Sequence, residues 1–315
     1  MREFISQDLF KQWGVSPTLE YGGASHPLVY EDATITPFGC YDTDGVLIDM
    51  SRHKRGRQTS PGVFPVASAP DTISPPTEFV DAKVYYINYA NSGHWGHFLT
   101  ETLARVNHLD APSLNVFVNG DLGVVKKMYP QHNYVSFSSI VRVKKLLLPV
   151  PTMVNCYSVF PEHIDTCRRL GDYFGRENNK YGKVYLSRTK LTRSNRWTQG
   201  EPELEKMLEF VGWNIIHMQE HSAREQMGIL ENSDVIAGCI GSAFHNLMMT
   251  RKNPGKVVYL TCNEFDTNPN YALHDAILRN DSVYLDCQDV VNKGNRTKRI
   301  RNPQEVFEYL ENVCK

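Results

Sequence analysis

The chain has 315 residues, of which 41% are hydrophobic, so it can bury the core of one large domain or of two moderate ones. Its formal net charge of −1 at pH 7 gives no global attraction to nucleic acid or to an anionic membrane. A charged partner therefore needs a local patch. Two basic runs, Arg52 to Arg57 and Lys293 to Arg301, are interpreted either as solvated loops or as contacts with an anionic lipid-linked or polymeric acceptor.

The N-terminus lacks a long apolar run, and no stretch of about 18 apolar residues occurs, so neither a signal peptide nor a membrane span is predicted. The seven cysteines are scattered and never spaced as Cys-x-x-Cys, which argues against a disulfide framework and a zinc cluster. We expect reduced, mostly buried cysteines in a cytoplasmic protein, with peripheral membrane association only through the basic loops.

The predicted elements change in kind along the chain. Residues 1–80 hold short apolar runs between turn-forming residues, which predicts a small β-rich opening. Strands then alternate with helices, as expected for parallel sheets with crossover helices. The predicted strands cover residues 83–89, 114–120, 141–150, 183–188, 213–218, 234–238 and 256–261. The predicted helices cover residues 93–109, 161–175, 201–212, 222–232, 242–250 and 303–313, with Ser222 and Glu225 as a capping box and Gly212 as a helix end.

This alternation predicts an α/β fold with two Rossmann-like domains facing a cleft. We expect a first domain over residues 1–160, composed of the β-rich opening 1–80 and a Rossmann-like part 81–160. A second domain is expected over residues 161–300, followed by a C-terminal helix over residues 301–315. Ligands of such folds bind beyond the carboxyl ends of the strands, so a site in the cleft is expected.

The stretch DVIAGCIGSAFHNLMM (residues 234–249) contains an apolar strand, a loop with Gly238 and Gly241, and a helix starting near Ser242. Small residues at this junction let a ligand approach the backbone, and free N–H groups of a first helical turn can bind phosphate. Tight packing between strand and helix explains the same glycines equally well.

Three arginines, Arg188, Arg193 and Arg196, follow directly on the strand over 183–188. Guanidinium groups match the geometry of phosphate oxygens, so the arginines and the glycine junction together suggest a diphosphate clamp. The alternative is a set of surface arginines paired with acidic groups such as Glu201 and Glu203.

The stretch NSGHWGHFLTETLAR (residues 91–105) places His97 and Glu101 four residues apart, on one face of a helix. A histidine hydrogen-bonded to a carboxylate is a general base with a fixed tautomer. Alternatively, Glu101 is the base and His97 holds a substrate hydroxyl. A third possibility is that His97 is a partly buried polar residue at a helix terminus, with its hydrogen bonds made inside the protein. Gly93, His94 and Trp95 belong to the same turn, and Trp95 is either a sugar platform or, as we favour, a core anchor.

Three ordered blocks between about residues 83 and 290 resemble the family-61 glycosyltransferases. The segment GHFLTETLAR is similar to the family signature His-Trp-Leu-x-Asp-x-Leu-Pro-Arg. The positions that match across the three blocks are His97, Glu101, Leu103, Arg105, Arg188, Arg196, Glu201, Gln226, Gly238, Gly241, Ser242 and Asn246. Glu101 stands where the family usually has aspartate, and Ile240 stands where it usually has histidine.

The resemblance implies a GT-B architecture and an inverting, metal-independent transfer from a nucleotide sugar to an acceptor hydroxyl. The first domain would then serve the acceptor and the second the donor. His97 and Glu101 are the expected catalytic residues, and Gly93, His94 and Trp95 the acceptor-side residues. The nucleotide sugar, expected to be UDP-linked, would contact Arg188, Arg193, Arg196, Glu201, Gly241, Ser242, Ala243, His245 and Asn246.

The expected partners are the nucleotide sugar and a glycan or lipid-linked saccharide acceptor, with no cofactor, metal or nucleic acid. No Asp-x-Asp pair is expected at a strand end, in agreement with metal independence. A polysaccharide pyruvyl transferase, which takes phosphoenolpyruvate, would share the architecture and the basic phosphate site. A non-catalytic glycan-binding relative is the second alternative, which Ile240 keeps open.

Overall fold

The computed structural model describes residues 1–14, 26–37, 39–51, 73–87, 94–118, 120–191, 197–264, 267–292 and 297–313. The chain forms two compact units: unit 1 comprises Met1–Pro17 and Arg168–Lys315, and unit 2 comprises Thr18–Cys167. The break after Cys167 lies close to the predicted boundary at residue 160, whereas the first residues group with unit 1 and not with the segment that follows them. The predictions for Gly93, Arg193, Arg196 and the basic run from Arg52 fall outside the described residues.

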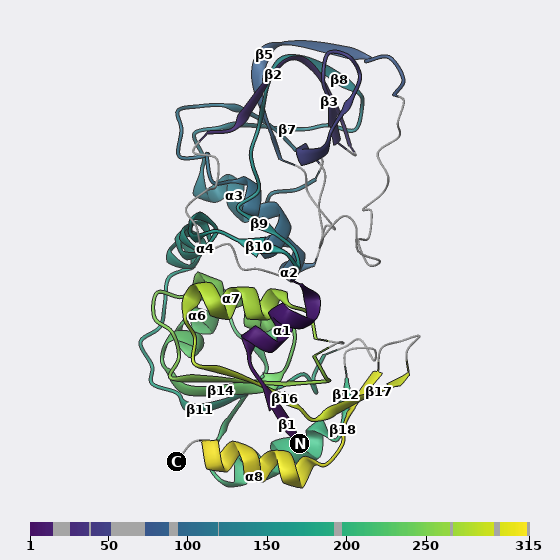
Figure 1. Cartoon of the computed structure of the whole chain (residues 1–315). Helices are drawn as coiled ribbons and strands as arrows, with labels where there is room; N and C mark the ends of the chain where they lie inside the picture. The colour runs from purple at the N-terminus through teal and green to yellow at the C-terminus, as the bar shows by residue number, and fades with distance from the viewer. Residues whose placement is uncertain are drawn as a thin grey trace. The chain divides into compact units, whose positions relative to one another are not determined.

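Unit 2 contains a seven-stranded mixed sheet with the order β4-β3-β2-β8-β5-β6-β7 (Figure 1). Strands β5, β6, β7 and β8 are parallel to their neighbours in this group, as the alternation predicted for β5, β6 and β8, whereas β7 was not predicted. The predicted β-rich opening is not a separate segment, because β2 pairs antiparallel with β8 and extends the same sheet. The strands are β2 (Leu28–Thr36), β3 (Gly39–Tyr41), β4 (Leu47–Ile48), β5 (Glu78–Ile87), β6 (Asn115–Val118), β7 (Asn133–Ser136) and β8 (Val141–Leu148).

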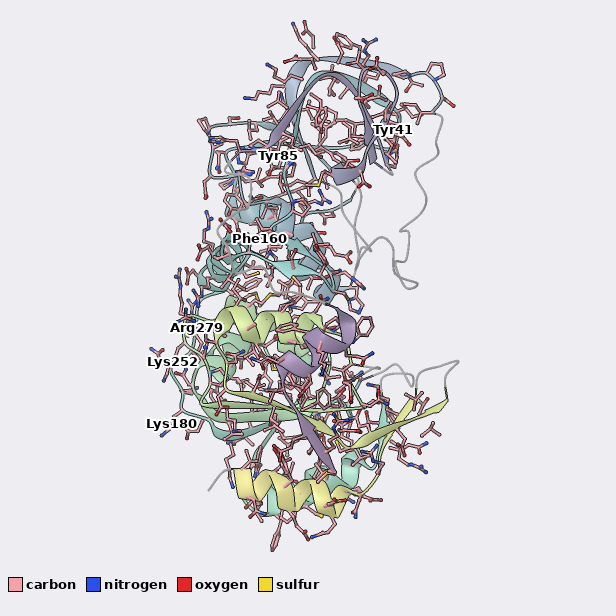
Figure 2. All side chains as sticks on the ribbon, viewed as in Figure 1. Tyr41, Tyr85, Phe160, Lys180, Lys252 and Arg279 are labelled. Atoms are coloured by element: carbon pink, nitrogen blue, oxygen red, sulfur yellow. The ribbon has the colours of Figure 1, made fainter. Side chains whose placement is uncertain are left out.

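Successive side chains of β5 point to opposite faces of this sheet, as the pleat requires. Val84 and Tyr86 belong to the core on one face, together with residues of β2, β3 and β8. Tyr85, labelled with Tyr41 in Figure 2, is also fully buried, and its hydroxyl donates to the Arg105 carbonyl at 2.8 Å. The helical segment that ends at Arg105 therefore packs against β5 through Tyr85.

The helical part of unit 2 starts with one continuous segment: the α-turn α2 (Trp95–His97), the π-turn η2 (Phe98–Thr102) and the 3₁₀-turn η3 (Leu103–Arg105). A short hairpin of β9 (Met153–Val154) and β10 (Ser158–Val159) follows the main sheet. The remaining elements are η1 (Asp49–Ser51), α3 (Val124–Met128) and α4 (Pro161–Phe174), which spans the break between the units.

Unit 1 is built on a six-stranded sheet with the order β1-β16-β15-β14-β11-β13. Every pair is parallel except β1 with β16. The parallel strands therefore have the flavodoxin-like order 2-1-3-4-5, with the topological switch point between β11 and β14. The strands are β1 (Arg2–Phe4), β11 (Gly182–Leu186), β13 (Asn214–Ile216), β14 (Ser233–Cys239), β15 (Lys256–Thr261) and β16 (Ser282–Asp286).

Helices cover both faces of this sheet, as expected for a doubly wound fold (Figure 1). Leu204 and Leu208 of α5 and Val306 and Leu310 of α8 are buried in the core on one face. On the other face lie α1, α6 and α7, with α1 packed against α7. The helical elements are α1 (Ser6–Trp13), α5 (Glu201–Phe210), η5 (Met218–Glu220), α6 (Ala223–Glu231), η6 (Ser242–Met249), α7 (Asn270–Leu278) and α8 (Pro303–Val313).

A small additional sheet of unit 1 contains β12 (Thr198–Gln199), β17 (Gln288–Asn292) and β18 (Thr297–Ile300). The end of the basic run from Lys293 lies here, and Arg301 forms ion pairs with Asp286 at 2.7 Å and with Asp289 at 3.2 Å. Lys180, Lys252 and Arg279 point outward from another part of unit 1 in Figure 2. None of the helices in the described ranges has the length and apolar character needed to cross a membrane.

Candidate functional site

The segment with the two predicted catalytic residues changes its helical geometry at the site. His94 is extended, α2 begins at Trp95, and the π-turn η2 carries Glu101. The Thr100 hydroxyl donates to the Gly96 carbonyl at 2.9 Å and so closes the turn on its own backbone. Short π-turns inside helices occur frequently at functional sites, because they displace side chains from the regular spacing.

His97 and Glu101 are in direct contact, as their spacing predicted. Nδ1 of His97 lies 3.1 Å from Oε1 of Glu101. The side chain of His97 is 26% exposed and that of Glu101 only 3%. A ligand can therefore reach the imidazole, whereas the carboxylate is an internal partner that fixes the ring.

Charged and aromatic groups surround this pair. The ring of His94 packs on that of His97 with centroids 4.6 Å apart. Arg105 is fully buried, which lowers its pKa, while the negative charge of Glu101 acts in the opposite direction. The Arg105 guanidinium also donates to the Met50 carbonyl at 2.9 Å. The Trp95 ring stacks on Phe98 at 5.3 Å, a contact within the helical segment that is compatible with the core-anchor interpretation.

One further side chain contacts Glu101 and has no counterpart in the sequence motifs. The Asn155 amide, from the turn between β9 and β10, donates to Oε1 of Glu101. Both residues are almost completely buried, at 3% and 4% exposure. No spacing rule links residues 54 positions apart, so only the folded hairpin reveals this contact.

In unit 1, two of the residues predicted to bind phosphate, Arg188 and Gly241, meet at the topological switch point. Leu186 of β11 pairs with Gly238 of β14, so the loops that follow these strands are neighbours. Nη1 of Arg188 donates to the Ile240 carbonyl at 3.0 Å, which holds the guanidinium beside Gly241. Ligands of doubly wound folds bind at this position in the sheet.

Glu201 is completely buried at the first turn of α5. Its Oε1 accepts hydrogen bonds of 3.2 Å from the Arg188 backbone amide and from the Tyr185 hydroxyl. Burial raises the pKa of Glu201 to about 7, and the hydrogen bond from Arg188 opposes that rise. Glu201 thus supports the Arg188 loop from inside and is not exposed to a ligand.

The two glycines of the junction have different reasons to be small. A Cβ on Gly238 would lie 2.7 Å from the Leu186 carbonyl oxygen, so close packing of β14 against β11 requires glycine. A Cβ on Gly241 would lie no closer than 3.6 Å to any neighbouring atom, at the Arg188 guanidinium. Packing therefore explains Gly238, and the space beside Gly241 can admit a ligand.

The helix predicted from Ser242 is the 3₁₀-helix η6, and only its start is accessible. Gly241, Ser242 and Ala243 are partly exposed, whereas the following residues of η6 are buried. His245 stacks on Tyr271 at 4.6 Å with nearly parallel rings. The Asn246 amide donates to Gln226 at 2.9 Å. The structure thus buries His245 and Asn246, two of the predicted nucleotide-binding residues, beneath the accessible start of η6.

Unit 2 also contains an open cavity of about 800 Å³ that none of the predicted site residues lines. Its floor includes Val29, Tyr85 and Leu147, which are neighbours across β2, β8 and β5. His26 and His108 stand on its wall. The segment after Arg105 also contributes to its lining. The sequence patterns did not predict this cavity.

The expectation about Asp-x-Asp pairs is wrong: Asp42-Thr43-Asp44 directly follows β3. Asp42 Oδ1 accepts the backbone amides of Asp44 at 3.0 Å and Val46 at 2.9 Å, so this carboxylate stabilises the turn before β4. Within the described residues, no group of three or more His, Cys, Asp or Glu side chains is placed to hold a metal ion.

The chain thus has two α/β units, one with a partly exposed histidine in front of a buried carboxylate and the other doubly wound with an arginine at its switch point. The sequence profile of the Glycosyltransferase 61 family matches residues 95–258, which is more than half of the chain. The chain belongs to this family and is a glycosyltransferase.

Among solved structures, the chain is similar to the bacterial iron-containing dodecameric glycosyltransferase TibC from enterotoxigenic E. coli H10407. The two are 13% identical, the alignment covers 80% of this chain and 83% of that chain, and the TM-score is 0.32. Comparison with curated proteins gives no match.

Proposed function

We propose that this glycosyltransferase is inverting and metal-independent and transfers a sugar from a UDP-linked donor to a hydroxyl of a glycan or lipid-linked saccharide. The observation that carries the proposal is the contact between His97 and Glu101, with the histidine partly exposed and the carboxylate buried. Membership of the glycosyltransferase family favours this reaction over pyruvyl transfer.

The exposures favour His97 over Glu101 as the base. A buried carboxylate that faces Nδ1 favours the tautomer with the proton on Nδ1, which leaves the lone pair of Nε2 to accept a proton. The acceptor hydroxyl gives its proton to Nε2 as its oxygen bonds to the anomeric carbon. The bond from that carbon to the diphosphate oxygen breaks in the same step, so the configuration inverts.

Unit 1 supplies the groups that stabilise the leaving diphosphate. Arg188 and the backbone amides at Gly241 and Ser242 lie at the switch point, where positive groups can meet the developing negative charge. Glu201 fixes the Arg188 backbone from inside. Arg193 and Arg196, which follow Arg188 in the sequence, are proposed to complete the clamp, and these groups take the role that a metal ion has in other transferases.

The acceptor side and the cellular location are proposed from the residues around His97 and from the basic runs. Gly93, His94 and Trp95 are proposed to line the acceptor side, because they precede His97 closely in the sequence. We propose a cytoplasmic enzyme in which basic loops provide the contact with a membrane-bound acceptor. Arg301 of the second basic run is paired with Asp286 and Asp289, so the Arg52 to Arg57 run is the better candidate.

A thermal-shift panel of nucleotides and nucleotide sugars tests the proposal. UDP and one UDP-sugar should raise the melting temperature, since a ligand at 100 times its Kd stabilises by about 2.7 kcal/mol. The same UDP-sugar should release UDP in a reaction that His97→Ala abolishes. Stabilisation by phosphoenolpyruvate alone would instead support pyruvyl transfer, and nucleotide binding with no release of UDP for any acceptor would support a non-catalytic relative.

A further inference from the structure

We propose that Asn155 is a positioning residue of the His97 and Glu101 pair, because its amide orients the buried carboxylate and stabilises the proton-free state of the pair. This inference rests on the proposed base function of His97. Oε1 of Glu101 faces both Nδ1 of His97 and the Asn155 amide. Only the N–H end of an amide can face a carboxylate oxygen, so Asn155 is a donor here.

The hairpin that presents Asn155 is fixed to the helical segment that it serves. The backbone amide and the hydroxyl of Thr152 both donate to the Ala104 carbonyl, at 2.9 and 3.2 Å. The Phe160 amide closes the hairpin by donating to the Thr152 carbonyl at 2.9 Å. Asn155 is therefore held opposite Glu101 by backbone contacts three residues farther along the same helical segment.

A buried histidine completes this support. Nδ1 of His163 lies 3.2 Å from the Thr152 hydroxyl, which accepts from the ring because its own proton goes to Ala104. Burial lowers the pKa of His163 to about 3, so this ring stays neutral at every pH at which the enzyme would be assayed. Titration of His163 therefore does not contribute to a pH profile of the pair.

Two further groups in the described part of the chain act on the pair. His94 packs on the ring of His97, and the Arg105 charge acts on Glu101. Asn155 is the uncharged donor among them, so it can stabilise the carboxylate without titrating. Its removal takes a hydrogen bond from the pair, and the loss is largest when the pair carries no proton and its net charge is −1.

Removal of the Asn155 amide shifts protonation of the pair in the same direction whether His97 or Glu101 holds the proton. Without the amide, the proton-free state becomes less favourable relative to the protonated state, so the pair takes up its proton at higher pH. For a hydrogen bond to a charged group, the shift is roughly one pH unit. The acid limb of the kcat profile should move upward by the same amount, since the proton-free pair is the active form.

The test compares Asn155→Ala with Asn155→Asp. If Asn155 only fills space, the isosteric Asp variant should have the same His97 midpoint pH as the wild type, and the Ala variant should differ more. If Asn155 stabilises the carboxylate, the Asp variant should show the larger upward shift of the midpoint pH, because it places a second carboxylate against Glu101. The midpoint pH of His97 titration should rise in the order wild type, Asn155→Ala, Asn155→Asp. It is measured by NMR of ¹⁵N-histidine-labelled full-length protein, and the His97 signal is assigned with His97→Ala.

Tyr157→Ala is the matched control, because Tyr157 lies in the same turn and is 41% exposed. This variant should leave the His97 midpoint unchanged and show that the hairpin tolerates substitution. Equal midpoints in wild type and both Asn155 variants, with folded spectra, would overturn the inference. Turnover of His97→Ala in UDP release separates the two proposals: wild-type turnover removes the base function, whereas abolished turnover with unshifted Asn155 variants removes only the role of Asn155.

Discussion

The backbone amide of Arg188 donates a 3.2 Å hydrogen bond to Oε1 of Glu201, which ties the second residue after β11 to the first turn of α5. The acceptor is a carboxylate without solvent exposure. In the part of the chain that the structure describes, its second oxygen, Oε2, has no hydrogen-bond partner. The loop at the switch point is thus supported by a group whose ionisation is opposed by burial.

Glu201 should therefore make the stability of unit 1 depend on pH. Burial raises its pKa from 4.5 to about 7. Its contribution to stability is fully present below about pH 4.5 and is lost as the pH rises through 7, by on the order of 3 kcal/mol. Glu201→Gln keeps an oxygen acceptor for Arg188 but cannot ionise.

Relative to Glu201→Gln, the wild type should lose melting temperature between pH 5 and pH 8 in calorimetric scans. Glu203→Gln is the control, because Glu203 lies on the same helical turn but is exposed. A constant difference between wild type and Glu201→Gln over this pH range would show that Glu201 does not change its charge there.

The glycine junction gives a matched pair of substitutions. Gly238→Ala should destabilise unit 1 by about 1–3 kcal/mol, because the new methyl group meets the Leu186 carbonyl at 2.7 Å. Gly241→Ala should leave the melting temperature nearly unchanged, since its nearest neighbour lies at 3.6 Å. It should nevertheless weaken UDP binding roughly tenfold or more, by displacing a phosphate hydrogen bond of 1.5–3 kcal/mol.

Isothermal titration of UDP into folded Gly241→Ala protein checks this expectation. Arg188→Ala provides the corresponding charge deletion and should weaken UDP binding by a similar factor. Wild-type affinity in both variants would place the nucleotide elsewhere. Loss of folding in Gly241→Ala would contradict the geometric argument that separates the two glycines.

Much of the fold could be predicted from local patterns. Seven strands, the Ser222 capping box and helix α8 are where the sequence placed them, and these strands are β5, β6, β8, β11, β13, β14 and β15. The parallel strands β7 and β16 were not predicted. Helix α7 was missed because its residues are buried on almost every side, so no polar face marks its period. Strand β1 was missed because its pairing with β16 connects opposite ends of the chain.

The candidate site was likewise predictable only where local patterns place residues together. Helical spacing brought His97 and Glu101 together, and strand order brought Arg188 near Gly241. Local patterns contain no information on Asn155, which reaches Glu101 only because a hairpin folds back on the helical segment. They also could not show that Gly238 serves packing and that His245 is buried, since both depend on distances between elements.

Chelation tests the proposed role of arginines in place of a metal. Turnover, measured as UDP release, should be unchanged after treatment with EDTA. If chelation abolishes turnover and manganese or magnesium restores it, the proposal of metal independence is wrong. Asp44→Asn would then be the first variant to examine, because Asp42 already accepts two backbone amides whereas Asp44 is exposed in the same turn.

The His97 and Glu101 pair should act as one unit in turnover. His97→Ala and Glu101→Gln should each reduce kcat by a factor of roughly 10² to 10⁴, the usual effect of losing a general base. UDP affinity should change little, because the proposed nucleotide-binding residues Arg188, Gly241 and Ser242 belong to unit 1. The double variant should be scarcely slower than His97→Ala, since Glu101 acts on the reaction through the imidazole.

A second histidine and glutamate with the same spacing provide the control for this prediction. Nδ1 of His221 lies 3.9 Å from Oε1 of Glu225, and both side chains are partly exposed. His221→Ala should leave kcat unchanged, which would show that the effect at His97 comes from its buried partner and not from any helical pair of this type. If His97→Ala and Glu101→Gln keep wild-type kcat while their melting temperatures fall, the pair is a packed helix terminus and another residue is the base. Multiplicative losses in the double variant would instead mean that the two residues act independently, with Glu101 contacting the substrate itself.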